Sequence, residues 1–285
     1  MGLNQFAVLG GDLRFTLLSD ALKQDRKQVF SLFQAGSGAI SLPALADVDC
    51  IILPLPISKD GIHLNAPFHN AQPPRLEHIF TQLNSKQMIL GGIVDEKTRT
   101  LADLHGLSLF DYYTEESFIL TGALATAEGA ISLAIAEHQS ILQGQKALIF
   151  GFGRIAKILA QKLSALGVCV CICARKQIDL DWANTLGYRY LPFSKLDDVI
   201  HEFALLFNTV PHPILDFQKL VFLQEQALYI ELASKPYGID FHTAENLGIH
   251  CILAESIPGK VAPFSMAHAL KDSIYSILQD NKQKE

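Results

Sequence analysis

Short apolar runs alternate along the chain with longer segments in which apolar residues recur at helical spacing. The short runs predict buried strands, and the longer segments predict helices that pack against them. The predicted strands lie at residues 6–9, 29–33, 48–53, 87–92, 107–112, 147–150, 168–173, 188–190, 203–207, 228–232 and 250–253. This alternation is typical of α/β proteins with doubly wound parallel sheets.

The longest helical pattern covers residues 121–142 and is rich in alanine and leucine. We expect it to lie in a connecting segment, residues 121–144, between two α/β domains. The first domain would hold residues 1–120 and be completed by a returning helix within 264–285. The second would be a Rossmann domain at residues 145–263. A chain of 285 residues is long enough for two such cores.

A glycine motif follows the apolar run at residues 147–150. Gly151, Gly153 and Ala156 form Gly-x-Gly-x-x-Ala between a predicted strand and a predicted helix, the context in which this motif indicates a dinucleotide site. The glycines allow a tight turn and close approach of a pyrophosphate to the helix N-terminus. The residues expected at the cofactor are Gly151, Phe152, Gly153, Arg154 and Ile155, with Thr209, Val210 and Pro211 after a later strand.

The end of the second strand of this βαβ unit should select the cofactor. NAD sites usually carry Asp or Glu there, whereas an Arg accommodates the 2′-phosphate of NADP. The chain has Ala174, Arg175 and Lys176, with no carboxylate before Asp179. We therefore expect NADP rather than NAD, with Arg175 binding the phosphate through two parallel N–H bonds. The alternative is that Arg175 and Lys176 are only solvated loop charges.

Composition narrows the class of protein. The formal net charge of −6 does not favour nucleic-acid binding, which needs a basic face. We find no signal-peptide pattern and no apolar stretch of membrane-spanning length, and therefore expect a cytoplasmic protein without a membrane partner. Cys169, Cys171 and Cys173 alternate along one strand and share one face, so they cannot surround an ion. We read them as small buried residues and expect no metal site.

Several loop sequences occur in a characteristic order. They are Gly10-Gly11-Asp12, Thr-Ala-Glu-Gly-Ala at 126–130, Gly-Phe-Gly-Arg at 151–154, Asn-Thr-Val-Pro at 208–211, Ala-Ser-Lys-Pro at 233–236 and Pro-Gly-Lys-Val-Ala-Pro at 258–263. In this order and spacing the chain resembles the A subunit of bacterial dipicolinate synthase over nearly its whole length. The resemblance implies an NADP-dependent oxidoreductase that converts dihydrodipicolinate to dipicolinate, in the sporulation branch of the lysine/diaminopimelate pathway. It also implies an oligomeric assembly and a partner in the form of a flavoprotein-like B subunit.

The chain departs from the family pattern at four positions. It has Ala125 where the family usually has proline, His212 where a small or apolar residue is expected, Glu231 in place of aspartate, and Tyr237 in place of glycine. None of these positions lies in the glycine motif. They leave the expected fold unchanged.

A substrate with two carboxylates needs cationic or N–H partners. Arg14, which follows the first glycine pair, is suited to bidentate binding, and Lys260 in a proline-bounded loop is a candidate for the other carboxylate. Ser58, Thr126 and Ser234 are candidate hydrogen-bond donors from turns at the cleft. Each of these residues has an alternative role, as an exposed side chain or as a helix cap.

The proton acceptor is not assigned. His212, in a loop on the cofactor side, and Glu128, near the start of the predicted helix at 121–142, are two candidates, and water is a third. Two other functions remain open: a different NADP-linked two-domain dehydrogenase acting on a small carboxylate, and a non-catalytic nucleotide-binding scaffold. The first usually needs an Arg and a carboxylate–His pair around a carbonyl, and the sequence shows no clear set.

Overall fold

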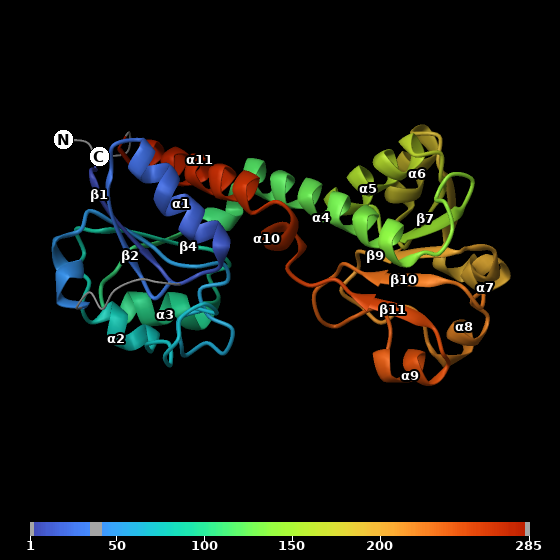
Figure 1. The fold of residues 1–285 in the computed structure, drawn as a ribbon, viewed down its shortest axis with the longest axis horizontal. Coiled ribbons are helices and arrows are strands. Elements are labelled where there is room, and N and C mark those ends of the chain that lie inside the picture. The colour runs from blue at the N-terminus through green and yellow to red at the C-terminus, as the bar shows by residue number, and fades with distance from the viewer. Residues whose placement is uncertain (1–2, 35–41, 283–285) are drawn as a thin grey trace. The chain divides into compact units, whose positions relative to one another are not determined.

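The computed structural model describes residues 3–34 and 42–282, which divide into two compact units. Unit 1 is formed by residues up to Thr121 and by those from Ala262 onward, and unit 2 by Gly122–Val261. Each unit is one parallel sheet with helices on both faces (Figure 1). The predicted doubly wound α/β class is therefore confirmed.

The sheet of unit 1 has the strand order β2-β1-β3-β4-β5, with every pair parallel. The order reverses between β1 and β3, so the loops after these two strands leave the sheet at its switch point. The strands are β1 (Gln5–Leu9), β2 (Gln28–Leu32), β3 (Cys50–Ile52), β4 (Met88–Gly91) and β5 (Leu109–Asp111).

Two long helices cover one face of this sheet, α1 (Leu13–Gln24) and α11 (Pro263–Lys282) (Figure 1). Lys271 and Tyr275 of α11 both donate hydrogen bonds to the carboxylate of Asp25 at the end of α1, each at 2.9 Å. The C-terminal helix therefore packs on the first sheet. The other face is covered by η1 (Leu42–Asp47), α2 (Leu76–Phe80) and α3 (Glu96–Leu104), and a turn of 3-10 helix, η2 (Tyr112–Thr114), follows β5.

The sheet of unit 2 has the strand order β11-β10-β9-β6-β7-β8, again with every pair parallel. Counted within the unit, this is the order 6-5-4-1-2-3 of the Rossmann fold, and its switch point lies between β6 and β9. The strands are β6 (Lys146–Phe150), β7 (Cys169–Ala174), β8 (Arg189–Pro192), β9 (Leu205–Asn208), β10 (Leu228–Glu231) and β11 (His250–Leu253).

Helices cover both faces of the second sheet and bury separate apolar cores. Residues from α4 (Glu116–Glu137), α5 (Arg154–Ala165) and α6 (Gln177–Thr185) form one core. Small residues such as Ala127, Ala134 and Ala160 are fully buried there and let α4 and α5 come close to the sheet. The second core uses α7 (Leu196–Val199), α8 (Phe217–Val221) and α9 (Phe241–Asn246), and the remaining short helices are η3 (Phe193–Lys195), η4 (Ile200–Glu202) and α10 (Ile257–Val261).

The structure corrects three expectations about local elements. Helix α4 runs over Glu116–Glu137 rather than 121–142, because an acidic residue favours its N-terminus and Phe118 is buried in contact with Tyr112. Residues 257–261 form the helix α10, where a loop was expected. Cys169 is exposed at the start of β7, although Cys171 and Cys173 are buried and burial raises the pKa of the Cys171 thiol to about 12.

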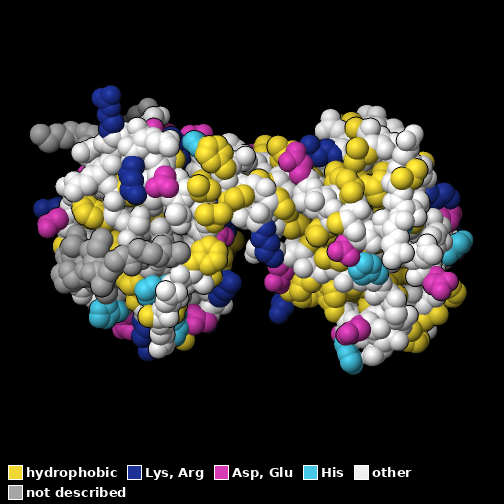
Figure 2. Space-filling model, in the orientation of Figure 1, with side chains coloured by type: hydrophobic (Ala, Val, Ile, Leu, Met, Phe, Trp, Pro, Cys, Tyr) yellow, Lys and Arg dark blue, Asp and Glu magenta, His cyan; other side chains and the backbone are white. Residues whose placement is uncertain are grey.

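Helix α4 also corrects the expectation that no segment is long and apolar enough to span a membrane. By length and composition α4 meets that criterion, with a mean hydropathy of 1.7 over its best window, half of which is buried inside the protein. A core helix of a water-soluble protein meets the same criterion when its alanines pack on a sheet, as they do here. On the face shown in Figure 2, basic and acidic side chains are interspersed.

Candidate functional site

The glycine turn after β6 lies directly against the loop after β9. Gly151 has a φ of +89°, and a Cβ atom there would be 2.8 Å from both Thr209 Oγ1 and Val210 Cγ2. The Thr209 hydroxyl donates a hydrogen bond of 2.7 Å to the carbonyl oxygen of Phe150, which fixes this contact. Position 151 therefore requires glycine for its conformation and for its surroundings.

Gly153 has a different environment. It is the N-cap of α5, and an ideal Cβ atom at this position would meet no atom within 4 Å. No side chain caps the helix, and no acidic residue lies in its first turn. Among the described residues no side chain therefore caps the first N–H groups of α5, and uncapped N–H groups at a helix N-terminus are the arrangement that binds a phosphate or pyrophosphate.

These two glycines border a pocket of about 600 Å³ at the carboxyl ends of the strands of unit 2. The pocket brings together nine residues predicted at the cofactor, namely Gly151, Phe152, Gly153, Ala174, Arg175, Lys176, Thr209, Val210 and Pro211. Arg154 and Ile155 lie in the first turn of α5 and are not among its lining residues. Asp179, Phe193, His212, Pro213 and Ile214 also line it, and of these only His212 was singled out from the sequence, as a proton acceptor.

The side of the pocket beyond β7 has a cationic character. Ala174 is buried at the end of the strand, and Arg175 and Lys176 follow it as exposed side chains. Asp179, in the first turn of α6, is the one acidic residue among those that line the pocket. Because no carboxylate occupies the end of β7, the strand end itself carries no group that repels a 2′-phosphate, and Arg175 has the fork geometry that binds one.

Arg14 lies at the carboxyl end of the unit 1 sheet, but it already has a partner. It is only 9% exposed, and its Nε and Nη2 atoms contact the Asp12 carboxylate at 2.8 and 2.7 Å. Its Nη2 atom also donates to the carbonyl oxygen of Leu55 at 3.4 Å. A second carboxylate at Arg14 would therefore have to share the guanidinium with Asp12.

The other predicted substrate residues lie in varied surroundings. The Ser58 hydroxyl donates to Asp60 at 2.9 Å and accepts from the Gly61 N–H at 2.9 Å, so it closes a turn. Ser234 is exposed in the loop after β10. Lys260 is exposed, on the helix α10 rather than in a loop.

Two predictions were wrong because the sequence placed the start of α4 too late. Thr126 lies in the middle of this helix, is buried, and donates its hydroxyl proton to the carbonyl oxygen of Gly122 at 2.8 Å. It is therefore not a donor in a turn. Glu128 also lies in mid-helix rather than in the first turn, and its carboxylate pairs with Lys162 of α5 at 2.9 Å. The acidic pair Glu115-Glu116, directly before apolar residues, was the signal that could have located the true start.

In the sequence, Glu231 stands out only as a departure from the family pattern, with no role assigned to it. Glu231, the last residue of β10, is fully buried and accepts hydrogen bonds from four uncharged donors. An acidic residue at the end of the apolar run 228–232 was the available signal. Its partners come from separate segments of the chain, so the sequence alone did not connect them.

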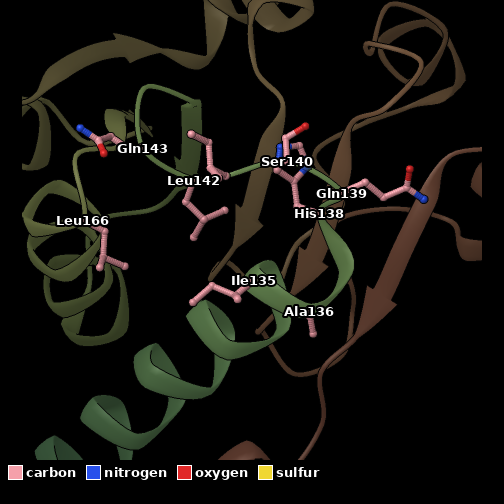
Figure 3. Close-up of a pocket in the computed structure, with 9 residues that line it drawn as sticks. Ile135, Ala136, His138, Gln139, Ser140, Leu142, Gln143 and Leu166 are labelled. Carbon is pink, nitrogen blue, oxygen red and sulfur yellow. The ribbon is translucent and has the colours of Figure 1, made fainter.

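A second hollow, of about 670 Å³, lies at the opposite end of the unit 2 sheet (Figure 3). Ile135, Ile141 and Leu166 line it, and they belong to segments that precede β6 or follow α5. His138 lies there too, and burial lowers its pKa. Since ligands of open α/β sheets bind beyond the carboxyl ends of the strands, this hollow is not the dinucleotide site.

Comparisons with known proteins agree with this architecture. A model of the N-terminal domain of the dipicolinate synthase A subunit matches residues 5–113. The A subunit of dipicolinate synthase from Bacillus subtilis (strain 168) is 25% identical over 291 aligned residues, which cover 99% of this chain and 98% of that protein. The crystal structure of the A chain of dipicolinate synthase from Bacillus subtilis has a TM-score of 0.87 at 24% identity and covers 100% of this chain and 99% of that one.

A protein named as a dehydrogenase has a similar fold. D-lactate dehydrogenase from Escherichia coli has a TM-score of 0.67 at 10% identity, with 98% of this chain and 97% of that chain covered. At this identity the likeness concerns the fold alone. It shows that the two-domain layout is one that a dehydrogenase uses.

Proposed function

We propose that the chain acts as a dipicolinate synthase A subunit, to which it is similar over nearly its whole length, and that it oxidises dihydrodipicolinate to dipicolinate with NADP as the hydride acceptor. The observation that carries the cofactor half of this proposal is the pocket of about 600 Å³, in which Arg175 and Lys176 lie with the glycine turn. The dehydrogenase fold supports the broader class of oxidoreductase.

The residues of the pocket fit a dinucleotide. Gly153 leaves open space where a side chain would stand, and the uncapped N-terminus of α5 supplies N–H groups for a pyrophosphate. Arg175 would bind the 2′-phosphate, with Ala174 avoiding the repulsion that an acidic residue would cause. Thr209, Val210 and Pro211 would form the wall next to the glycine turn.

The proposed reaction needs little acid–base catalysis. A hydride leaves a ring carbon and a proton leaves a neighbouring atom, and the product ring becomes aromatic. Bound NADP supplies the hydride acceptor, at C4 of the nicotinamide. Because aromatisation drives the reaction, the protein contributes mainly by orienting the two reactants. His212 and water remain the candidate proton acceptors.

In the substrate site we propose Arg14 and Lys260 as the carboxylate-binding cations, with Ser58 and Ser234 as donors. Asp12 accepts from the Nε and Nη2 atoms of Arg14 and holds the guanidinium in one orientation, so a substrate carboxylate would bind the guanidinium alongside Asp12. We also propose that the chain works in the cytoplasm as an oligomer, and that its partner is a flavoprotein-like B subunit.

Turnover of the purified chain tests the proposal. We expect NADPH and dipicolinate to form in equal amounts from NADP and freshly generated dihydrodipicolinate. Oxidation of 2-hydroxy acids instead would indicate another dehydrogenase of the same layout. Binding of NADP without turnover of either substrate class would indicate a non-catalytic scaffold.

A further inference from the structure

The buried carboxylate of Glu231 joins two strands and the loops that follow them. Two donors come from the strands: Asn208 Nδ2 at 2.7 Å and the Tyr229 hydroxyl at 2.9 Å. Two come from the loop after β10: the N–H groups of Ala233 at 3.0 Å and Gly238 at 2.7 Å. A buried carboxylate is costly without such donors, and this one has two for each oxygen.

Asn208 connects this carboxylate to the wall of the dinucleotide pocket. It pairs with Glu231 across β9 and β10, and its side-chain amide spans the next turn. Its Nδ2 atom donates to the carbonyl oxygen of Val210 at 2.9 Å, and its Oδ1 atom accepts from the Val210 N–H at 2.9 Å. The turn held in this way carries Thr209, Val210 and Pro211, which line the pocket.

Gly238, in the loop after β10, connects the Glu231 carboxylate to the far end of loop 209–215. Its carbonyl oxygen accepts from the N–H groups of Ile214 at 2.7 Å and Leu215 at 3.0 Å. A Cβ atom on Gly238 would clash with the Tyr229 hydroxyl and with Asn208 Nδ2, so the backbone reaches the carboxylate without room for a side chain. Both ends of the loop 209–215 are thus fixed to Glu231, one through Asn208 and one through Gly238.

Tyr229 has a different role in the same network. Its hydroxyl binds the carboxylate from within β10, and the structure records no hydrogen bond from it to the described residues of loop 209–215. Burial raises the pKa of Tyr229, so the hydroxyl keeps its proton and remains a donor. The Tyr229 side chain also interacts with the Asn208 side chain, so Tyr229 reaches the pocket wall only through Asn208.

We propose that Glu231 is a positioning residue: its carboxylate fixes loop 209–215 and so sets the shape of the dinucleotide pocket without touching the dinucleotide. This role rests on the proposed function only in that the pocket must bind a dinucleotide. On this proposal, the position of loop 209–215 depends on hydrogen bonds to one buried carboxylate and not on the packing of the loop's own side chains.

The experiment measures the dissociation constant of NADP by calorimetry, on the purified full chain, for a matched pair of variants. Asn208→Ala and Tyr229→Phe each remove one donor to Glu231. Only Asn208→Ala also removes the two hydrogen bonds that hold the backbone of Val210. We expect Asn208→Ala to weaken NADP binding about ten-fold or more, and Tyr229→Phe to change it by about two-fold at most. Thermal melting of both variants, read in parallel, checks that they are folded.

Two variants at the carboxylate itself complete the test. Glu231→Gln replaces one acceptor oxygen with an NH2 group that faces two donors, so it should behave as Asn208→Ala does. Glu231→Asp keeps the charge and should restore most of the affinity. Equal effects of Asn208→Ala and Tyr229→Phe on NADP binding, or no effect of either, would overturn the positioning role. If the wild-type chain binds neither NADP nor NAD, the proposed function is refuted and this role with it.

Discussion

A Cβ atom on Gly151 would lie 2.8 Å from the hydroxyl oxygen of Thr209, so the turn after β6 and the loop after β9 fit together only with glycine at that position. These two segments meet at the switch point of the Rossmann sheet, where a dinucleotide would cross from one half of the unit to the other. Both residues line the pocket, so the fit between these two segments also determines its shape.

Gly151→Ala should weaken dinucleotide binding and destabilise unit 2. A left-handed conformation costs alanine roughly 1–2 kcal/mol, and the approach to Thr209 adds a displacement of the pocket loop. Gly187→Ala is the matched control, because Gly187 also has a positive φ, of +81°, but has no atom near its Cβ position. Calorimetry should show a loss of NADP binding only for Gly151→Ala, and equal binding by the two variants would contradict this reading.

Arg175→Asp should weaken NADP far more than NAD, since it removes the partner of the 2′-phosphate and adds repulsion. The loss of one charge-assisted pair is worth on the order of 1.5–3 kcal/mol. Lys23→Asp makes the same change of charge on α1 of unit 1, at a residue that does not line the pocket, and should leave both affinities unaltered. If Arg175→Asp lowers both affinities equally, Arg175 supports the loop and does not select the cofactor.

Arg14→Ala should raise the KM for dihydrodipicolinate about ten-fold and leave NADP binding nearly unchanged, because we place Arg14 at the substrate. Arg14→Lys keeps the charge but loses the fork that contacts both oxygens of Asp12, so it should restore only part of the loss. Steady-state kinetics with each substrate varied in turn provide the measurement. Unaltered kinetics for Arg14→Ala would remove Arg14 from the substrate site.

The pH dependence of stability should report the contact between α1 and α11. Hydrogen bonds from Lys271 and Tyr275 hold the pKa of the Asp25 carboxyl below its usual range. A lowered pKa in the folded state means that the ionised group stabilises the fold above its unfolded pKa, and that this contribution is lost as the pH falls through the folded value. Asp25→Asn should therefore cost about 1 kcal/mol near neutral pH.

Below about pH 4, where the unfolded carboxyl becomes protonated, the difference between Asp25→Asn and the wild type should shrink. Denaturant unfolding at a series of pH values measures this. Asp20→Asn is the control, since Asp20 pairs with Lys23 at 3.3 Å on the exposed face of the same helix. A penalty for Asp25→Asn that is no larger than the penalty for Asp20→Asn would show that the contact to α11 adds no stability.

The features that could be predicted are those that depend on residues close together in the sequence. The turn at Gly151 and Gly153, the apolar strand before it and the charges at Arg175 and Lys176 are all read from one continuous segment. The structure brings the two glycines and the two cations into one pocket. Strand positions were predicted within a few residues throughout, because buried parallel strands are nearly continuous apolar runs.

The rest depended on contacts between distant segments. The start of α4 was misplaced because residues 116–120 become helical through packing of Phe118 against Tyr112, and this error misplaced Thr126 and Glu128. The network around Glu231 needs β9 and β10 to pair in one register, which sets Asn208 opposite Glu231. The short helices α8 and α9 were not predicted either, because a helix of five or six residues carries little periodicity.

The most direct test of the central claim follows the hydride itself. Dihydrodipicolinate labelled with deuterium at the ring carbon that is oxidised should be incubated with NADP and the purified chain, and the NADPH analysed by mass spectrometry. The account predicts one deuterium in each NADPH formed, in equal amount to dipicolinate. Dipicolinate without NADPH, or NADPH without the label, would contradict it.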